Sequence, residues 1–175
     1  VGFGEKEIKS ILELEPLFIS VFVNVFTFLV LPIVINYLNI FIEKTLFIHN
    51  SAFKNCKSLR SINFPQRIST IGFNSFRGCK SLSKITFENN SKLSQILDYA
   101  FRGCSSLEEI SIPEKIANIE PYTFYSCENL KKITLSSSLQ TIGESAFAFC
   151  RELDSVTLPE SLKIIEAKAF SSCTN

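Results

Sequence analysis

Two stretches of the sequence are nearly alike: SFRGCKSLSKITF at Ser75–Phe87 and AFRGCSSLEEISI at Ala100–Ile112. In both, a Phe precedes a Cys by three residues, and a Leu follows the Cys by three. A cysteine at a fixed place suggests a metal ligand, a disulfide or a nucleophile, but a repeated packing unit produces the same regularity. The spacing along the rest of the chain bears on this choice.

The unit recurs from the first cysteine to the end of the chain. The cysteines are separated by steps of 23, 25, 23, 23 and 23 residues: Cys56, Cys79, Cys104, Cys127, Cys150 and Cys173. One Phe column and five further apolar columns keep the same steps, as F-x-x-C-x-x-L-x-x-I-x-[IFL]-P-x-x-[IL]-x-x-I. The longer step comes from two extra residues within Glu88–Lys92, where we expect a surface loop.

A unit of this length cannot bury its apolar side alone, but stacked copies of it can, which predicts a solenoid. The alternation in L-x-x-I-x-I indicates a short strand, and equivalent strands would stack in parallel about 4.8 Å apart. Pro65, Pro113 and Pro159 would end the strand, and I-x-x-I would cross the other side. The A-F-x-x-C part would form a tight helical or 3₁₀ turn. The predicted fold is therefore a solenoid of 23-residue repeats with short parallel strands stacked in one sheet.

This pattern resembles the BspA-like, or treponemal-type, leucine-rich repeat, over about residues 45–175. The resemblance implies a protein-binding solenoid, and we expect no catalytic activity and no cofactor. Members of that family are often surface proteins of mucosal bacteria and parasitic protists, implicated in adhesion to host cells, matrix proteins or other microbes. Surface display and host or extracellular-matrix protein partners are thus expectations drawn from the resemblance.

The spacing of the cysteines favours a packing role. Zinc sites use paired cysteines or nearby histidines, whereas each cysteine here stands alone and His49 is the single histidine. The same scarcity of histidine argues against a cysteine nucleophile and an enzyme. Disulfides between neighbouring repeats stay open as the alternative. Because the cysteines share a register with inward-facing Phe and Leu, we interpret them as small buried hydrophobes with a weak S–H donor.

The first part of the chain does not keep the repeat. Residues 1–16 form an acidic amphipathic segment, and residues 17–42 contain no charged side chain. Three interpretations of 17–42 compete: a membrane span or signal-anchor, a degenerate repeat, and an artefact of a truncated or mistranslated fragment. The sequence starts without Met and stops within the pattern, so we expect both ends to be cut.

Charge and one short motif bear on location. Lys and Arg total 18 against 17 Asp and Glu, which lacks the excess of positive charge that nucleic-acid binding requires. Asn89-Asn90-Ser91 is an N-glycosylation sequon and would suit an exported protein. Basic residues follow 17–42 and acidic ones precede it, which by the positive-inside rule favours cytoplasmic repeats. Location therefore stays open between the cell surface or membrane and the cytoplasm.

The candidate binding residues alternate with the inward columns of the predicted strand and should face solvent. They are Ser61, Asn63, Lys84, Thr86, Glu109, Ser111, Lys132, Thr134, Ser155 and Thr157. The set is rich in hydroxyls, carries both signs of charge and has no aromatic anchor, so we expect weak multivalent protein binding. The leading hypothesis is a surface adhesion solenoid, and the alternative is an intracellular protein-interaction scaffold.

Overall fold

The computed structural model describes residues 46–174. The segments 1–16 and 17–42 lie outside these residues, together with every interpretation placed on them. Among residues 46–174, no helix is long and apolar enough to cross a membrane.

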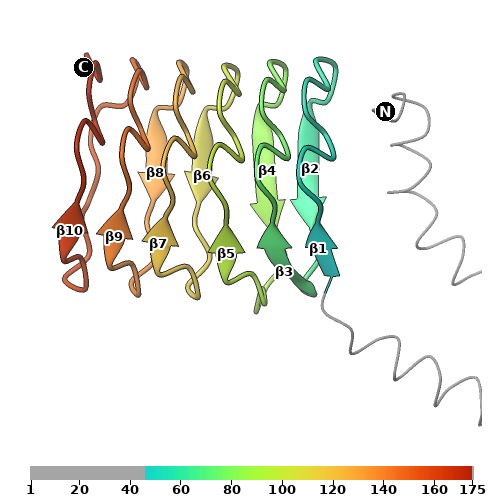
Figure 1. The fold of residues 1–175 in the computed structure, drawn as a ribbon, viewed down its shortest axis with the longest axis horizontal. Coiled ribbons are helices and arrows are strands. Elements are labelled where there is room, and N and C mark those ends of the chain that lie inside the picture. Colours follow the sequence, from blue (N-terminus) through green and yellow to red (C-terminus); the bar gives the residue numbers. More distant parts are fainter. Residues whose placement is uncertain (1–45, 175) are drawn as a thin grey trace, which may run out of the picture. The chain divides into compact units, whose positions relative to one another are not determined.

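One side of the repeats forms a four-stranded parallel sheet in the order β2-β4-β6-β8 (Figure 1). Its strands are β2 (Ser61–Phe64), β4 (Lys84–Phe87), β6 (Glu109–Ser111) and β8 (Lys132–Thr134). Equivalent residues of successive repeats pair with each other, as Ile62 does with Ile85 and Ile110 with Ile133. The solenoid of 23-residue repeats predicted from the sequence is confirmed.

The opposite side of the repeats also carries strands, which the prediction of one sheet did not include. They are β1 (Leu46–Ile48), β3 (Ile68–Ile71), β5 (Gln95–Ile96), β7 (Asn118–Ile119), β9 (Thr141–Ile142) and β10 (Ile164–Ile165). They form two sheets, β1-β3-β5 and β10-β9-β7. The same repeat length that aligns the first sheet aligns the I-x-x-I backbones, whose amides and carbonyls then pair with the neighbouring repeat.

The core is a stack of equivalent side chains. Phe76, Phe101, Phe124 and Phe147 are fully buried, and their rings stack at centroid distances of 5.4, 5.6 and 5.4 Å. Phe53 continues the stack at 5.0 Å from Phe76. Each repeat thus covers the apolar side of its neighbour, as the column pattern predicts.

Consecutive turns connect the two sides, and within 46–174 they do not lengthen into a helix. N–H groups donate to the carbonyl three residues earlier, as Cys79 does to Phe76 at 3.2 Å. Two positions of the turn have positive φ. Six repeats fill the first position, with Ser51, Asn74, Tyr99, Tyr122, Ser145 and Lys168. The second position holds Asn55, Gly78, Gly103, Ser126, Phe149 and Ser172.

The two extra residues lie in the loop between β4 and β5. The N–H of Lys92 donates to the carbonyl of Gln66 at 2.8 Å, so the repeats are back in step immediately after the loop. Residues 88–90 are exposed, as expected for an insertion that a surface loop absorbs.

The last repeat departs from the prediction. Ile165 was expected to be buried, but 48% of it is exposed, as is 46% of Leu158. No further repeat covers them within the described residues. The strand expected around Ser155 and Thr157 is reduced to a single bridge between Lys132 and Ser155.

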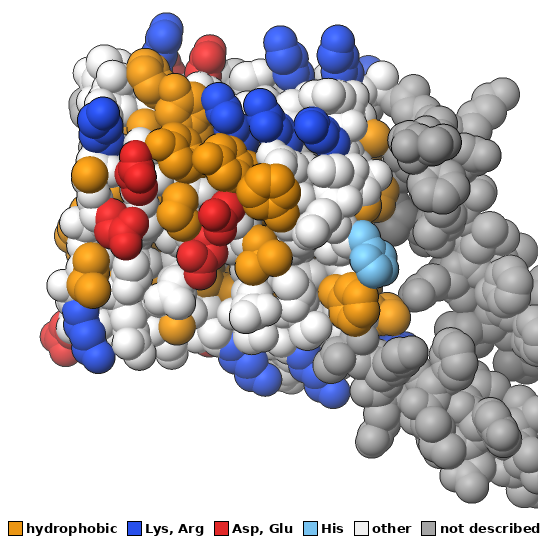
Figure 2. Space-filling view, viewed as in Figure 1, with side chains coloured by type: hydrophobic (Ala, Val, Ile, Leu, Met, Phe, Trp, Pro, Cys, Tyr) orange, Lys and Arg blue, Asp and Glu red, His pale blue; other side chains and the backbone are white. Residues whose placement is uncertain are grey.

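Hydrophobic side chains also reach the surface. On the face shown in Figure 2 they gather in a band, with Lys and Arg along one side of it and Asp and Glu along the other. Exposed patches of this kind often mark interaction sites.

Candidate functional site

The cysteine column is part of the packing. Cys79, Cys104, Cys127 and Cys150 are fully buried, and all six cysteines are free thiols. Each of the last five donates its S–H to the carbonyl of a Phe one repeat earlier, at 3.0–3.3 Å, as Cys127 does to Phe101. The thiol therefore fills a small space and satisfies a buried carbonyl.

Burial also makes these thiols poor nucleophiles. Desolvation, with a smaller contribution from the neighbouring Cys56, raises the pKa of Cys79 to about 12. The pKa of Cys150 is likewise raised to about 12, mainly by burial. A reactive cysteine needs a lowered pKa and access to solvent. Within the described residues, no group of His, Cys, Asp and Glu side chains could hold a metal ion.

The candidate binding residues lie on the outer side of the β2-β4-β6-β8 sheet, which we call the polar face. Nine of the ten are exposed and Thr86 is half-buried. One register row contains Ser61, Lys84, Glu109, Lys132 and Ser155, each paired with the next. Basic, acidic and basic side chains therefore alternate across β4, β6 and β8. In the second row, the hydroxyl of Thr86 donates to Asn63 Oδ1 at 2.9 Å.

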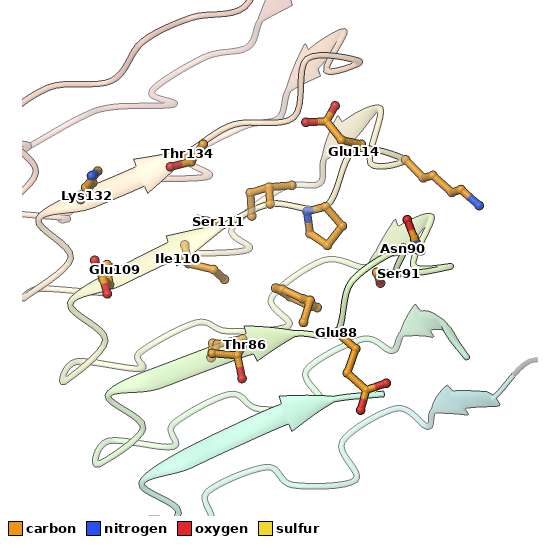
Figure 3. A pocket seen from close by; sticks show the side chains of 15 residues that line it. Thr86, Glu88, Asn90, Ser91, Glu109, Ile110, Ser111, Glu114, Lys132 and Thr134 are labelled. Atoms are coloured by element: carbon orange, nitrogen blue, oxygen red, sulfur yellow. The ribbon is translucent and has the colours of Figure 1, made fainter. Parts of the chain in front are cut away.

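The polar face is hollowed between β4 and β8 (Figure 3). The pocket has a volume of about 750 Å³. Five of the predicted residues line it: Thr86, Glu109, Ser111, Lys132 and Thr134. Of the others, Ser61, Asn63 and Lys84 lie on β2 and β4, and Ser155 and Thr157 lie in the last repeat.

The loops that follow β4 and β6 form one wall of the pocket (Figure 3). Glu88 accepts a hydrogen bond from the N–H of Gln66 at 2.9 Å, and Glu114 accepts one from the N–H of Ser137 at 3.1 Å. Glu88 therefore ties its loop to the preceding repeat, and Glu114 ties its loop to the following one. Asn90 and Ser91, which also line the pocket, come from Glu88–Lys92, the segment that contains the two-residue insertion. The sequence placed this insertion in a loop but did not show that the loop borders the candidate binding residues.

The sequon lies at the same edge. Asn89 is exposed, and its neighbours Asn90 and Ser91 line the pocket. A glycan on Asn89 would therefore stand beside the pocket. His49 lies elsewhere, beside Phe47 at the end of β1, with a ring-centroid distance of 5.0 Å. The pocket thus offers hydroxyls and charges of both signs but no histidine base.

A set of partly exposed aromatic side chains away from the polar face was not predicted from the sequence. They are Phe73, Tyr99, Tyr122, Tyr125 and Phe149, and we call them the aromatic row. Their rings contact one another at centroid distances of 4.9–5.6 Å. A signal was present in the sequence, because Tyr99 and Tyr122 occupy the same position of successive repeats. The other members hold three different positions, and only the folded turns bring them together.

Stacked parallel strands, a repeated Phe–Cys–Leu core and an open polar face define a leucine-rich repeat solenoid. The profile of the BspA type leucine rich repeat region matches residues 46–175 in six copies. The chain belongs to this family, whose repeats generally serve protein–protein interaction and are typically non-catalytic.

Solved structures of bacterial proteins share the fold. A leucine rich cell surface protein of Faecalibacterium prausnitzii is 28% identical, with a TM-score of 0.55 over 73% of this chain and 40% of that one. A leucine-rich repeat protein of Eubacterium ventriosum is 28% identical, with a TM-score of 0.65 over 73% and 34%. The pneumococcal vaccine antigen PcpA is 32% identical, with a TM-score of 0.62 over 72% and 33%.

The chain thus spans less than half the length of these proteins. No curated protein matches the sequence.

Proposed function

We propose that the chain is part of a cell-surface protein whose polar face binds host or extracellular-matrix proteins. The observation that carries this proposal is the pocketed polar face, where the exposed hydroxyl and charged side chains of successive repeats align. Similarity to a protein described as a cell surface protein and to a vaccine antigen supports the surface location.

Binding through this face would be distributed over several repeats. Three neighbouring strands present Lys84, Glu109 and Lys132 in turn. A partner with the opposite order of charges could pair with all three. Exposed ion pairs are individually weak, so affinity would come from the number of repeats engaged at once. The pocket between β4 and β8 would hold a partner side chain, because five of the candidate binding residues line it.

Two accessory features fit surface display and are part of the proposal. Residues 17–42 would anchor the protein in the membrane, since their uncharged length suits a span. Asn89 would carry an N-glycan if the protein passes through a eukaryotic secretory pathway.

The alternative is an intracellular scaffold that uses the same polar face. The charge bias around 17–42 favours it, because Lys44, Lys54, Lys57 and Arg60 follow that segment. Both proposals require protein binding, so a binding assay does not distinguish them. They differ in the side of the membrane on which the repeats lie.

Topology is tested by tagging the full-length protein after its repeats and treating intact cells with a protease that cannot enter. The surface proposal expects loss of the tag on intact cells. Protection until lysis would contradict surface display and support the scaffold.

A further inference from the structure

The aromatic row lies on turns that are separate from the polar face. Phe73 contacts Tyr99 at a centroid distance of 5.5 Å, and Tyr99 stacks on Tyr122 at 4.9 Å. Tyr125 joins Tyr122 at 5.6 Å and Phe149 at 5.2 Å. Phe73 is 40% exposed and the other four are half-buried. A continuous row of aromatic side chains thus reaches solvent across successive repeats.

Three of these aromatic side chains occupy unfavourable backbone positions. Tyr99, Tyr122 and Phe149 have φ of 60°, 57° and 63°. Bulky side chains are rare in this left-handed region. Other repeats fill the same two positions mainly with small side chains or glycine: Ser51, Asn55, Asn74, Gly78, Gly103, Ser126, Ser145 and Ser172. The aromatic row is therefore not required by the turn.

Carboxylates flank the aromatic row. They come from consecutive repeats, and we call Asp98, Glu120, Glu144 and Glu166 the acidic row. The hydroxyl of Tyr122 donates to Glu144 Oε1 at 2.9 Å, which joins the two rows. Glu166 accepts a hydrogen bond from the N–H of Glu144 at 2.9 Å. Within residues 46–174, the only hydrogen bonds to carboxylates of this row come from a hydroxyl and a backbone amide, and none comes from Lys or Arg.

These carboxylates interact with one another. Burial raises the pKa of Glu120, and the charges of Asp98 and Glu166 raise it further. Like charges held this close favour a nearby cation.

The aromatic row already binds one cation from the chain itself. The guanidinium of Arg102 lies 4.8 Å from the ring centroid of Tyr125 and 5.6 Å from that of Tyr99. Ring faces attract cations through their quadrupole, most strongly where water is excluded. Tyr122, whose hydroxyl donates to Glu144, and Phe149 have no such cation among the described residues.

We propose that the aromatic and acidic rows together bind an extended, arginine- or lysine-bearing segment of a partner protein. Its cations would contact the rings of Tyr122 and Phe149 and pair with the acidic row, and its backbone would run along the stacking direction of the repeats. The two rows follow that direction, which favours an extended segment over a compact one. This surface is distinct from the polar face, so the inference goes beyond the proposed function and does not depend on it.

The test uses fluorescence anisotropy of a labelled synthetic peptide that alternates Arg with Gly, titrated with the whole chain. A matched peptide has Gln in place of every Arg. We expect the Arg peptide to bind about tenfold more tightly than the Gln peptide, since both cation–π contacts and charge pairing require the cation. Equal affinities of the two peptides would overturn the proposal.

Two variants separate this site from general charge attraction. The double variant Tyr122→Asn, Phe149→Ser keeps every charge and introduces residues that other repeats use at these positions. It should bind the Arg peptide about tenfold more weakly while its melting temperature stays the same or rises. Unchanged binding by this variant would also overturn the proposal.

The second variant, Ser111→Trp, blocks the pocket of the polar face. It should leave Arg-peptide binding unchanged, and a loss of binding would place the peptide on the polar face instead.

Discussion

At the scale of single residues, the regularly spaced cysteines suggest a metal site or a nucleophile, although their role is packing. Each buried thiol donates to a Phe carbonyl of the preceding repeat, as Cys127 does to Phe101 at 3.3 Å. The spacing and the scarcity of histidine were enough to predict packing cysteines. The carbonyl acceptor could not be predicted, because it depends on how far successive repeats are offset.

The thiols predict how stability depends on alkaline pH. The pKa of Cys150 rises from its ordinary value of 9.0 to about 12 in the folded chain. Unfolded chains therefore lose this proton first, so the free energy of unfolding is at its full value below about pH 9 and falls above it. The decrease is at most about 1.4 kcal/mol per pH unit for each such thiol.

Urea unfolding at about pH 8 and about pH 11 measures this decrease. The variant Cys150→Ala, which cannot titrate there, should lose less stability over the same interval. An equal loss of stability in both proteins would contradict the raised pKa of Cys150.

Ser75 is a residue whose replacement should stabilise the fold. Its side chain is fully buried, and its hydroxyl has no hydrogen-bond partner. Ala100, Ala146 and Ala169 occupy the equivalent position in other repeats. The change Ser75→Ala should raise the free energy of unfolding by about 1 kcal/mol, because it removes an uncompensated buried hydroxyl.

Thr123 provides the control, because it has the same position but its hydroxyl donates to the carbonyl of Glu120 at 2.7 Å. Thr123→Ala should therefore destabilise the protein. Urea denaturation measures both variants, and a lower midpoint for Ser75→Ala would be evidence against the orphan hydroxyl.

At the scale of elements, the strands of the polar face were predictable and those of the opposite side were not. The strand containing Ile110 shows the alternation of buried and exposed residues that the sequence indicates. By contrast, β7 (Asn118–Ile119) and β9 (Thr141–Ile142) have two residues each, too few to show a period. These strands form because the backbones of successive repeats pair in register, and the sequence of a single repeat does not reveal this pairing.

Two glycines of the turns should respond differently to the same change. A Cβ at Gly143 would lie 2.8 Å from the backbone nitrogen of Pro121 and 2.9 Å from the carbonyl oxygen of Ile119. Gly103 has a φ of +73° but open space around it, with the nearest atoms 3.9 Å away. Gly103→Ala should cost about 1 kcal/mol through its backbone conformation alone. Gly143→Ala should cost more, since neighbouring backbone must move.

Thermal unfolding followed by circular dichroism compares the two glycine variants. A melting temperature for Gly143→Ala at or above that of Gly103→Ala would show that the repeats are not packed as closely as described.

At the scale of the whole molecule, the sequence predicted which side would be polar but not where it would be hollow or aromatic. The pocket needs the Asn90 loop and the strands of two further repeats to lie together. The aromatic row needs Tyr125 and Phe149, from different repeat positions, to meet across a turn. Such surfaces depend on contacts between repeats, whereas the buried columns follow directly from the spacing.

The polar face is the central claim, and the most direct measurement is binding of the chain to a panel of immobilised extracellular-matrix proteins. We predict measurable binding by the natural sequence and a loss of at least about tenfold for Ser111→Trp, which fills the pocket. The variant Tyr122→Asn, Phe149→Ser serves as a control away from this face and should bind the matrix proteins as the natural sequence does. Equal binding by the Ser111→Trp variant and the natural sequence would contradict the assignment of the polar face.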